Sequence, residues 1–290
     1  MNNSQTLTLP APAKVNRFLH VLNRRPDGYH NLQTAFQFID LCDEISFQRR
    51  DDSSIHLITP LQSVATHDNL IVKAAQLLQQ HTGCTSGIDI SLKKNIPMGA
   101  GLGGGSSDAA TTLIALNQLW QLDLSQESLL NLATQLGADV PIFIYGQAAW
   151  AEGIGNRFTP QSPDEPWYLL IQPPIHIQTA ALFQQLSEHP LRTRLIQPTT
   201  AFDKLSNDFE ALVIKQFPHL QALVKTLEPH TQLRLTGTGS VMYGTFDTRD
   251  EASTIASLAP ANCHTIVTKG KNISPLFEAL DGQLWGVAKW

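Results

Sequence analysis

The opening segment of the chain, up to residue 58, consists of strand-like runs, and the spacing of apolar residues becomes helical after it. Breakers at Pro26, Asp27 and Gly28 separate the first two strand-like runs. Four runs have this strand character, at residues 14–22, 32–41, 45–47 and 55–58. Apolar residues then recur three and four positions apart over residues 70–80, where Asp68 or Asn69 suits an N-cap. The pattern predicts β-structure at the start of the chain, followed by a first helix.

A predicted strand at residues 88–92 leads into a glycine-rich segment, and an apolar helix is expected over residues 109–120. A further helix is predicted over residues 125–137, with Ser125 as its N-cap and Gly137 as its stop. Strands are expected next at residues 142–145, 148–151 and 167–171. The middle of the chain is therefore expected to contain two helices followed by three strands.

The segment 159–166 is rich in proline, serine and acidic residues, which is typical of a linker. Because 290 residues fit two domains, we expect an N-terminal domain at 1–158 and a C-terminal domain at 159–290. In the second half, helices are predicted at 179–186, 209–217, 219–227 and 250–258. Strands are predicted there at 233–235, 241–246 and 264–269.

Composition and charge exclude several classes of function. A net charge of −5, with 42% hydrophobic and 16% charged residues, fits a globular chain without a basic stripe, so no nucleic-acid partner is expected. No apolar run approaches the roughly 18 residues that cross a bilayer, and the N-terminal residues lack an export or import pattern. We therefore expect no membrane partner and a cytoplasmic location. Cys42, Cys84 and Cys263 are expected to be reduced, and no histidine spacing predicts a dedicated metal site.

The segment from Pro97 to Ser107 carries the strongest chemical signal. It reads PMGAGLGGGSS, with five glycines and no charged residue, between a predicted strand and a predicted helix. Glycine lets the backbone approach a ligand closely, and the free N–H groups of a helix start bind phosphate. A structural turn is the alternative, but it needs one or two glycines. The P-loop lysine is absent, so Mg²⁺ carried with the nucleotide, together with Lys94 or Lys14, is expected to neutralise the phosphates.

Several residues outside this loop have both a structural and a chemical interpretation. Lys14, flanked by apolar residues, either extends from a strand edge or pairs with an acid. Asp139 is either a turn or N-cap aspartate, or a carboxylate held against a substrate hydroxyl. Gly237 and Gly239 form either a second approach to the ligand or a plain turn between strands. Local sequence leaves these alternatives open.

The glycine-rich loop resembles the second motif of the GHMP kinase superfamily. Further matching motifs follow in the family's order: AKVN at 13–16, RPDGYH at 25–30, DNL at 68–70, LGADVP at 136–141 and TGTG at 236–239. The following residues, 240–244, depart from the family pattern, in which a small residue, Cys, Val and Phe are more usual. The resemblance implies an α+β fold, with one domain like domain 2 of ribosomal protein S5 and a ferredoxin-like C-terminal domain.

The resemblance also implies a reaction: transfer of the γ-phosphate of ATP, carried with Mg²⁺, to the 2-hydroxyl of diphosphocytidyl-methylerythritol in isoprenoid synthesis. A superfamily kinase for another alcohol, such as mevalonate, homoserine or a sugar, is one alternative. A non-catalytic nucleotide-binding protein is the other. Either a monomer or a homodimer is compatible with the sequence.

The resemblance assigns roles to individual residues. Asp139 would be the base, and Lys14 would stabilise charge. The cytosine would lie between Tyr29 and Phe183, with its polar edge on His30. The full set for the cytidyl substrate is Asn16, Tyr29, His30, Thr179, Phe183, Gly237 and Gly239. The set for ATP is Asn69, Lys94, Pro97, Met98, Gly99, Ala100, Gly101, Leu102, Gly103, Gly104, Gly105, Ser106 and Ser107. Asp108 is assigned no chemistry.

Overall fold

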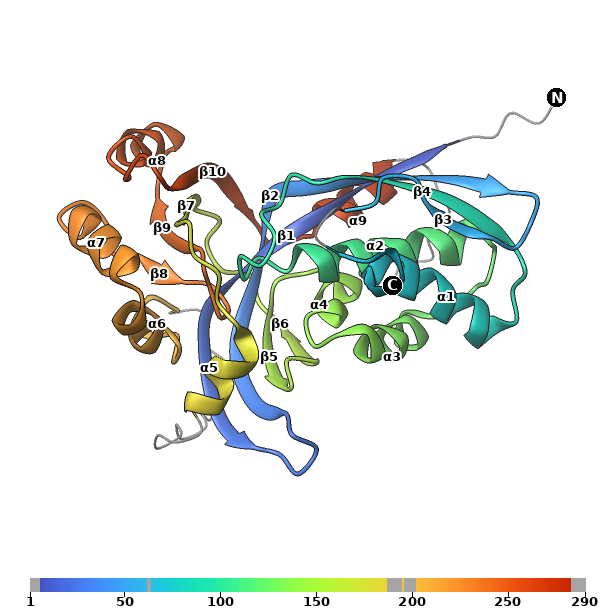
Figure 1. The fold of residues 1–290 in the computed structure, drawn as a ribbon, viewed down its shortest axis with the longest axis horizontal. Coiled ribbons are helices and arrows are strands. Elements are labelled where there is room, and N and C mark those ends of the chain that lie inside the picture. The colour runs from blue at the N-terminus through green and yellow to red at the C-terminus, as the bar shows by residue number, and fades with distance from the viewer. Residues whose placement is uncertain (1–5, 62–63, 187–194, 196–201, 283–290) are drawn as a thin grey trace.

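The computed structural model describes residues 6–61, 64–186, 195 and 202–282, and in these residues one sheet of ten strands runs through the molecule (Figure 1). The strands are β1 (Leu7–Arg24), β2 (His30–Arg50), β3 (Ile55–Leu57), β4 (Gly87–Lys93), β5 (Ala149–Gly153), β6 (Arg157–Pro160), β7 (Trp167–Gln172), β8 (Arg234–Leu235), β9 (Met242–Phe246) and β10 (His264–Lys271). The helices are α1 (Leu70–Thr82), α2 (Gly104–Leu119), α3 (Gln126–Leu136), α4 (Val140–Tyr145), α5 (Thr179–Leu186), α6 (Glu210–Gln216), α7 (Pro218–Leu227), α8 (Arg249–Ala256) and α9 (Pro275–Gly282). Two 3₁₀ turns, η1 (Thr66–Asp68) and η2 (Phe202–Lys204), complete the described elements.

The long antiparallel pair β1–β2 forms the spine of the molecule and appears as two blue strands in Figure 1. Different stretches of β2 pair with β1, β4, β5 and β10, so this strand links both halves of the chain. The β1–β2 register slips at three places, one of them between Asn16 and Phe18. Such a slip is a β-bulge, which bends a strand and redirects its side chains.

Two large apolar clusters lie on either side of this spine. The first packs helices α1 to α4 against the N-terminal strands, and the second packs α6, α7 and α8 against β7 and β9. Figure 1 shows these groups at opposite ends of the molecule, in green and orange. The chain returns to the first cluster near its end, where Leu276 and Leu280 of α9 are buried. The division at residue 158 remains a proposal.

Four of the expected elements differ from the structure. Residues 142–145 were predicted as a strand but belong to helix α4, which has Pro141 in its first turn. A proline at that position pre-organises a helix start, whereas the apolar run around it has no period that separates a short helix from a strand. The predicted strands at 32–41 and 45–47 are one continuous strand, β2. In addition, α2 begins at Gly104 rather than at residue 109, and α9 was not predicted.

No described helix has both the length and the apolar composition that crossing a membrane requires.

Candidate active site

The glycine-rich loop connects β4 to the first turn of α2 and forms one wall of a cavity of about 340 Å³. Every residue expected to bind ATP lines this cavity except Ser107, which is buried within α2. The cavity also contacts residues that the sequence did not single out for this role: Leu61, Val64, Asp68, Leu70 and Asp108. Asn69 uses its side chain to cap α1, because its Oδ1 accepts the N–H of Ile71 at 2.9 Å.

Close approach explains two of the glycines. Gly101 and Gly103 have φ angles of 77° and 74°, a region that favours glycine. A Cβ on Gly103 would lie 2.8 Å from the Phe143 ring and 3.0 Å from Cε of Lys14. A Cβ on Gly101 would collide with the carbonyl oxygen of Thr236. The loop backbone is therefore pressed against both Lys14 and the TGTG segment.

Lys14 from β1 and Asp139 from the start of α4 meet beside this loop. Lys14 is 1% exposed, and its Nζ lies 3.2 Å from Oδ2 of Asp139. The same ammonium donates to Asn16 Oδ1 at 2.7 Å and to the Gly101 carbonyl at 3.0 Å. Asp139 occupies the N-cap position of α4 but makes no side-chain capping bond, and its side chain is 41% exposed. A carboxylate that is accessible, yet held by a buried ammonium, can receive a proton from a bound hydroxyl.

Lys94 lies between two buried carboxylates. Its Nζ bonds to Asp43 and lies 2.8 Å from Oδ2 of Asp108. Burial alone would lower the pKa of Lys94, but the charges of Asp108 and Asp43 outweigh burial and raise it. Burial raises the pKa of Asp108 to about 7, although the charge of Lys94 opposes the shift. The charge of Lys94 is thus already matched by carboxylates of the protein itself.

Asp43 also fixes the start of the loop, because its Oδ1 accepts the N–H groups of Asn95 and Ile96 at 2.6 and 2.8 Å. Sequence reasoning missed both Asp43 and Asp108 as site residues. The sequence offered little signal for Asp43, since it lies next to Glu44 and three residues after Asp40 and looks like any acidic residue of that segment. A charged residue is rarely buried without a partner, so the sequence alone did not indicate this burial.

The residues expected around the cytosine come from three elements. His30 of β2 stacks on Phe183 of α5, with ring centroids 5.0 Å apart, whereas the neighbouring Tyr29 is 57% exposed. Burial and then the charge of Arg24 lower the pKa of His30, which favours its neutral form. Thr179, at the start of α5, shares a hydrogen bond of 2.8 Å with the Thr238 hydroxyl. The structure thus joins α5 both to β2 and to the TGTG segment.

The TGTG segment packs against the glycine-rich loop. Gly237 and Gly239 have φ angles of 56° and 84°. Thr236 accepts the N–H of Asn16 at 3.0 Å and donates to the Gly101 carbonyl at 3.4 Å. Asn207, which the sequence did not indicate, donates to the Gly237 carbonyl at 2.7 Å. The two glycine segments and the Lys14–Asp139 pair therefore form one continuous site.

This arrangement, a glycine-rich loop at a helix start facing a lysine–aspartate pair, on a mixed sheet with helices, defines the class of GHMP kinases. The family profile described as GHMP kinases N terminal domain matches residues 69–147, which contain both the loop and Asp139. The expected α+β GHMP kinase fold is confirmed by this match and by a solved structure described below.

The chain is 48% identical over 278 residues to the 4-diphosphocytidyl-2-C-methyl-D-erythritol kinase of Pseudomonas syringae pv. syringae, covering 94% of this chain and 97% of that relative. It is 45% identical over 283 residues to the enzyme of the same name from Methylococcus capsulatus, with 96% of each chain covered. A crystal structure of 4-(cytidine 5'-diphospho)-2C-methyl-D-erythritol kinase matches with a TM-score of 0.77 at 30% identity, over 91% of this chain and 100% of that one. The chain belongs to the 4-diphosphocytidyl-2-C-methyl-D-erythritol kinase family, and it is an ATP-dependent small-molecule kinase.

Proposed function

We propose that this kinase phosphorylates the 2-hydroxyl of 4-diphosphocytidyl-2-C-methyl-D-erythritol, giving the 2-phosphate and ADP in the non-mevalonate isoprenoid precursor pathway. The observation that carries the proposal is the Lys14–Asp139 pair, 3.2 Å apart at the edge of the glycine-rich loop. The identity of 48% to a relative of that name supports the cytidyl acceptor. The stacked His30–Phe183 pair supports it independently, because aromatic rings suit a nucleobase.

In the reaction, Asp139 takes the proton of the acceptor hydroxyl as its oxygen attacks the γ-phosphorus of ATP. A new oxygen–phosphorus bond forms, and the bond from the γ-phosphorus to the bridging oxygen of ADP breaks. Lys14 orients the carboxylate and stabilises the charge that develops on the transferred group. Its contacts to Asn16 and Gly101 hold the ammonium in place without a reorganisation of solvent.

The glycine-rich loop binds the ATP phosphates in this proposal. The first N–H groups of α2 lack partners within the helix, and the positive end of the helix dipole favours phosphate. The apolar residues Leu61, Val64 and Leu70 suit the base of the nucleotide.

We propose that Mg²⁺ is carried with ATP rather than held in a site of its own. In the described residues no group of three or more His, Cys, Asp or Glu side chains could hold a metal ion. Mg²⁺ commonly keeps several phosphate and water ligands, so it does not need a dedicated set of protein ligands. The ion would neutralise phosphate charge in a loop that has no lysine of its own.

His30, Phe183 and Tyr29 form the cytosine pocket in this proposal. A neutral His30 offers one donor and one acceptor to the polar edge of the base. Tyr29 is sufficiently exposed to cover the face of the base that Phe183 leaves open. We assign Asn16, Thr179, Gly237 and Gly239 to the rest of the substrate, because Asn16 contacts Lys14 and Thr179 contacts the TGTG segment. A cytoplasmic location, and a monomer or homodimer, stay predictions.

The test is ADP release from ATP and Mg²⁺ with four acceptors: the cytidyl substrate, mevalonate, homoserine and galactose. We expect turnover with the cytidyl substrate alone. Turnover with another acceptor would retain the Lys14–Asp139 chemistry but contradict the cytosine pocket. Absence of turnover with all four would favour a non-catalytic nucleotide-binding protein.

A further inference from the structure

The bulge in β1 lies directly beside the catalytic lysine. Asn16 pairs with Phe36 and Phe18 pairs with Ala35, so Arg17 is the extra residue that forms the bulge in β1. A bulge frees peptide groups from the regular ladder, and buried peptide groups need partners elsewhere. Asn16 Oδ1 accepts a hydrogen bond from the Lys14 ammonium. The position of this acceptor therefore depends on the contacts that fix the bulge.

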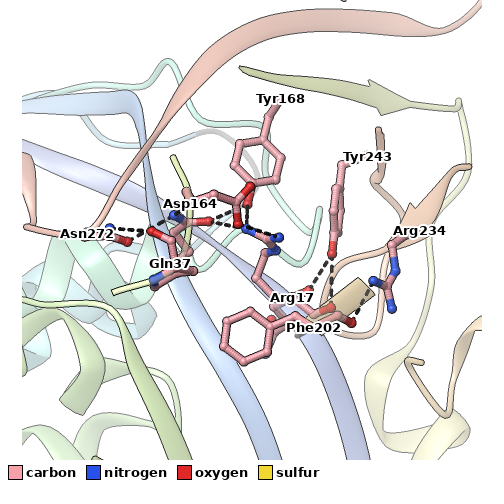
Figure 2. A network of polar contacts seen from close by, with 10 residues as sticks. Arg17, Gln37, Asp164, Tyr168, Phe202, Arg234, Tyr243 and Asn272 are labelled. Atoms are coloured by element: carbon pink, nitrogen blue, oxygen red, sulfur yellow. Dashed lines mark hydrogen bonds and ion pairs between the residues drawn. The ribbon is translucent and has the colours of Figure 1, made fainter. Parts of the chain in front are cut away.

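Side chains of the hairpin formed by β8 and β9 bind the backbone of the bulge. The N–H of Asn16 donates to the Thr236 hydroxyl at 3.0 Å. On the other side of the residue, the Tyr243 hydroxyl lies 3.2 Å from the Asn16 carbonyl oxygen and 3.3 Å from that of Arg17. Figure 2 shows Tyr243 directed toward the backbone at Arg17. Tyr243 is buried, so water does not compete effectively for these carbonyl groups. One hairpin thus binds Asn16 at both of its peptide groups.

The side chain of Arg17 anchors the same bulge in a second direction. Its Nη1 donates to Gln37 Oε1 at 3.0 Å and to the Tyr168 hydroxyl at 3.2 Å, and its Nη2 lies 3.2 Å from Asp164 (Figure 2). The Tyr168 hydroxyl donates in turn to Gln37 Oε1. Burial raises the pKa of Tyr168, so its hydroxyl stays protonated. The rings of Tyr168 and Tyr243 meet edge to face, with centroids 5.4 Å apart, which joins both anchors.

We propose that Tyr243 is a positioning residue for phosphoryl transfer, acting through the Asn16–Arg17 bulge. Its hydroxyl fixes the Asn16 backbone, and the Asn16 side chain holds Nζ of Lys14 at 2.7 Å. Tyr243 touches neither reactant in this arrangement. The inference rests on the proposed role of Lys14, because a shift of Asn16 matters to the reaction only if the ammonium stabilises the transferred group.

The variant Tyr243→Phe tests the proposal because it removes one oxygen and retains the ring that packs on Tyr168. We expect kcat to fall about 10-fold, since small displacements of a catalytic group have large effects on rate. The KM for ATP is expected to stay within about two-fold of wild type, whereas the KM for the cytidyl acceptor can rise together with the fall in kcat, because Asn16 also belongs to the acceptor set. A wild-type kcat, or a rise in both KM values with kcat unchanged, would overturn the proposal.

A matched control is Tyr145→Phe, which removes the hydroxyl of a tyrosine stacked on Phe158 at the far end of α4. This variant is expected to retain the wild-type kcat. Circular dichroism and thermal melting of both variants establish that each is folded at the assay temperature. An equal fall of kcat in Tyr145→Phe would show a general effect of hydroxyl removal and contradict the specific role of Tyr243.

A double-mutant cycle shows whether Tyr243 acts through Asn16. If it does, Tyr243→Phe reduces kcat less in an Asn16→Ala background than in the wild type. Losses that multiply would mean that the two residues act separately and would overturn the proposal. Lys14→Met is measured in parallel. Wild-type turnover in that variant would refute the proposed function of Lys14, whereas an inactive Lys14→Met beside a wild-type-like Tyr243→Phe would refute the positioning role alone.

Discussion

At the scale of single residues, the site depends on an ammonium that is buried but not neutralised by one partner alone. Nζ of Lys14 is shared among Asn16, the Gly101 carbonyl and Asp139. Two of these acceptors are fixed by other parts of the protein, and only the carboxylate has open access to the substrate side. Lys14 can therefore orient Asp139 while keeping a positive charge close to the transferred phosphate. Arginine is not equivalent to lysine at this position, because a guanidinium is planar and larger than an ammonium, and Cε of Lys14 already lies 3.0 Å from where a Cβ on Gly103 would stand.

The first prediction concerns Asp139→Asn. An amide cannot take the hydroxyl proton, so we expect kcat to fall by about 10²–10⁴-fold. Nucleotide affinity is expected to change little, because Asp139 is not among the residues that line the loop cavity. Steady-state ADP release and a titration with ATP measure the two quantities. Asp250→Asn, an exposed carboxylate in the first turn of α8, is the control and should leave both unchanged.

The second prediction concerns Tyr29→Ala. The loss of a base–aromatic stack costs about 1–3 kcal/mol, which corresponds to a rise in the KM for the cytidyl substrate of about 5- to 150-fold. The KM for ATP serves as an internal reference and is expected to stay within about two-fold of wild type. Equal increases in both values would mean that Tyr29 does not contact the cytosine.

At the scale of elements, the start of α2 shows how backbone conformation and close approach act together. The N-cap residue Gly103 has a left-handed conformation and also faces Phe143 and Lys14 without space for a Cβ. The C-cap of α1, Gly83, has a similar φ of 71°, but a Cβ there would meet no atom within 4 Å in the described part of the chain. A substitution at Gly83 would therefore introduce backbone strain alone, whereas a substitution at Gly103 would introduce both backbone strain and a steric clash.

The third prediction compares Gly103→Ala with Gly83→Ala. Both variants place a side chain at positive φ, so each should lose about 1 kcal/mol of unfolding free energy from backbone strain, and Gly103→Ala should lose more because its methyl group would lie 2.8 Å from the Phe143 ring. Only Gly103→Ala should also lose activity, by about 10-fold or more, because its methyl group displaces the loop or the Lys14 side chain. Urea denaturation and kcat measured on both proteins test this. Equal activity of the two variants would contradict the close approach at Gly103.

Local patterns were sufficient for elements whose ends carry strong signals. The helix predicted at residues 125–137 corresponds to α3, and its predicted N-cap is confirmed, since the Ser125 side chain accepts the N–H of Ser128. The prediction for α4 was wrong because Ile142, Phe143 and Ile144 are all buried. Three consecutive apolar residues have no periodicity that distinguishes a helix from a strand. The helical start of α2 at Gly104 could not be predicted, since glycine and serine disfavour helix and only tertiary packing accounts for it.

The candidate site divides in the same manner. The loop was recognisable from its own glycine-rich sequence, whereas Lys14 and Asp139 were singled out through the family resemblance, since their local sequence left a structural interpretation open. The stack of His30 on Phe183 and the pairing of Lys94 with Asp43 were not, because each joins residues from separate elements. The role inferred for Tyr243 depends on a bulge in another strand, for which a single sequence contains no signal.

At the scale of the whole molecule, one buried carboxylate makes stability depend on pH. Burial raises the pKa of Asp108 to about 7, in the presence of the charged Lys94 and Asp43. The folded protein thus binds a proton at this site that the unfolded chain has already released above its ordinary pKa near 4. The stabilisation that the proton provides is fully present below about pH 4 and is lost as the pH rises through about 7.

The fourth prediction therefore concerns Asp108→Asn. Asparagine has the same shape and does not ionise, so the variant should lose less unfolding free energy than wild type between pH 5 and pH 8. The expected difference is on the order of 2 kcal/mol, from about 1.4 kcal/mol per pKa unit. Lys94 stays charged throughout this range, because its pKa is raised. Urea denaturation at pH 5, 6.5 and 8 measures the effect, and parallel curves for the two proteins would contradict it.

The pairing of β2 with β10 has a consequence for the order of events during protein synthesis. Residues 38–39 meet residues 270–271, so β2 leaves the ribosome long before its partner has been translated. In the meantime the nascent chain has the loop, Lys14 and Asp139, but the middle of its central strand still has open hydrogen-bonding groups. Such an edge invites pairing with other chains. A ribosome that stalls in the second half of the message would therefore carry an aggregation-prone chain. Lys14, Asp139 and the glycine-rich loop would already have been synthesised in that chain.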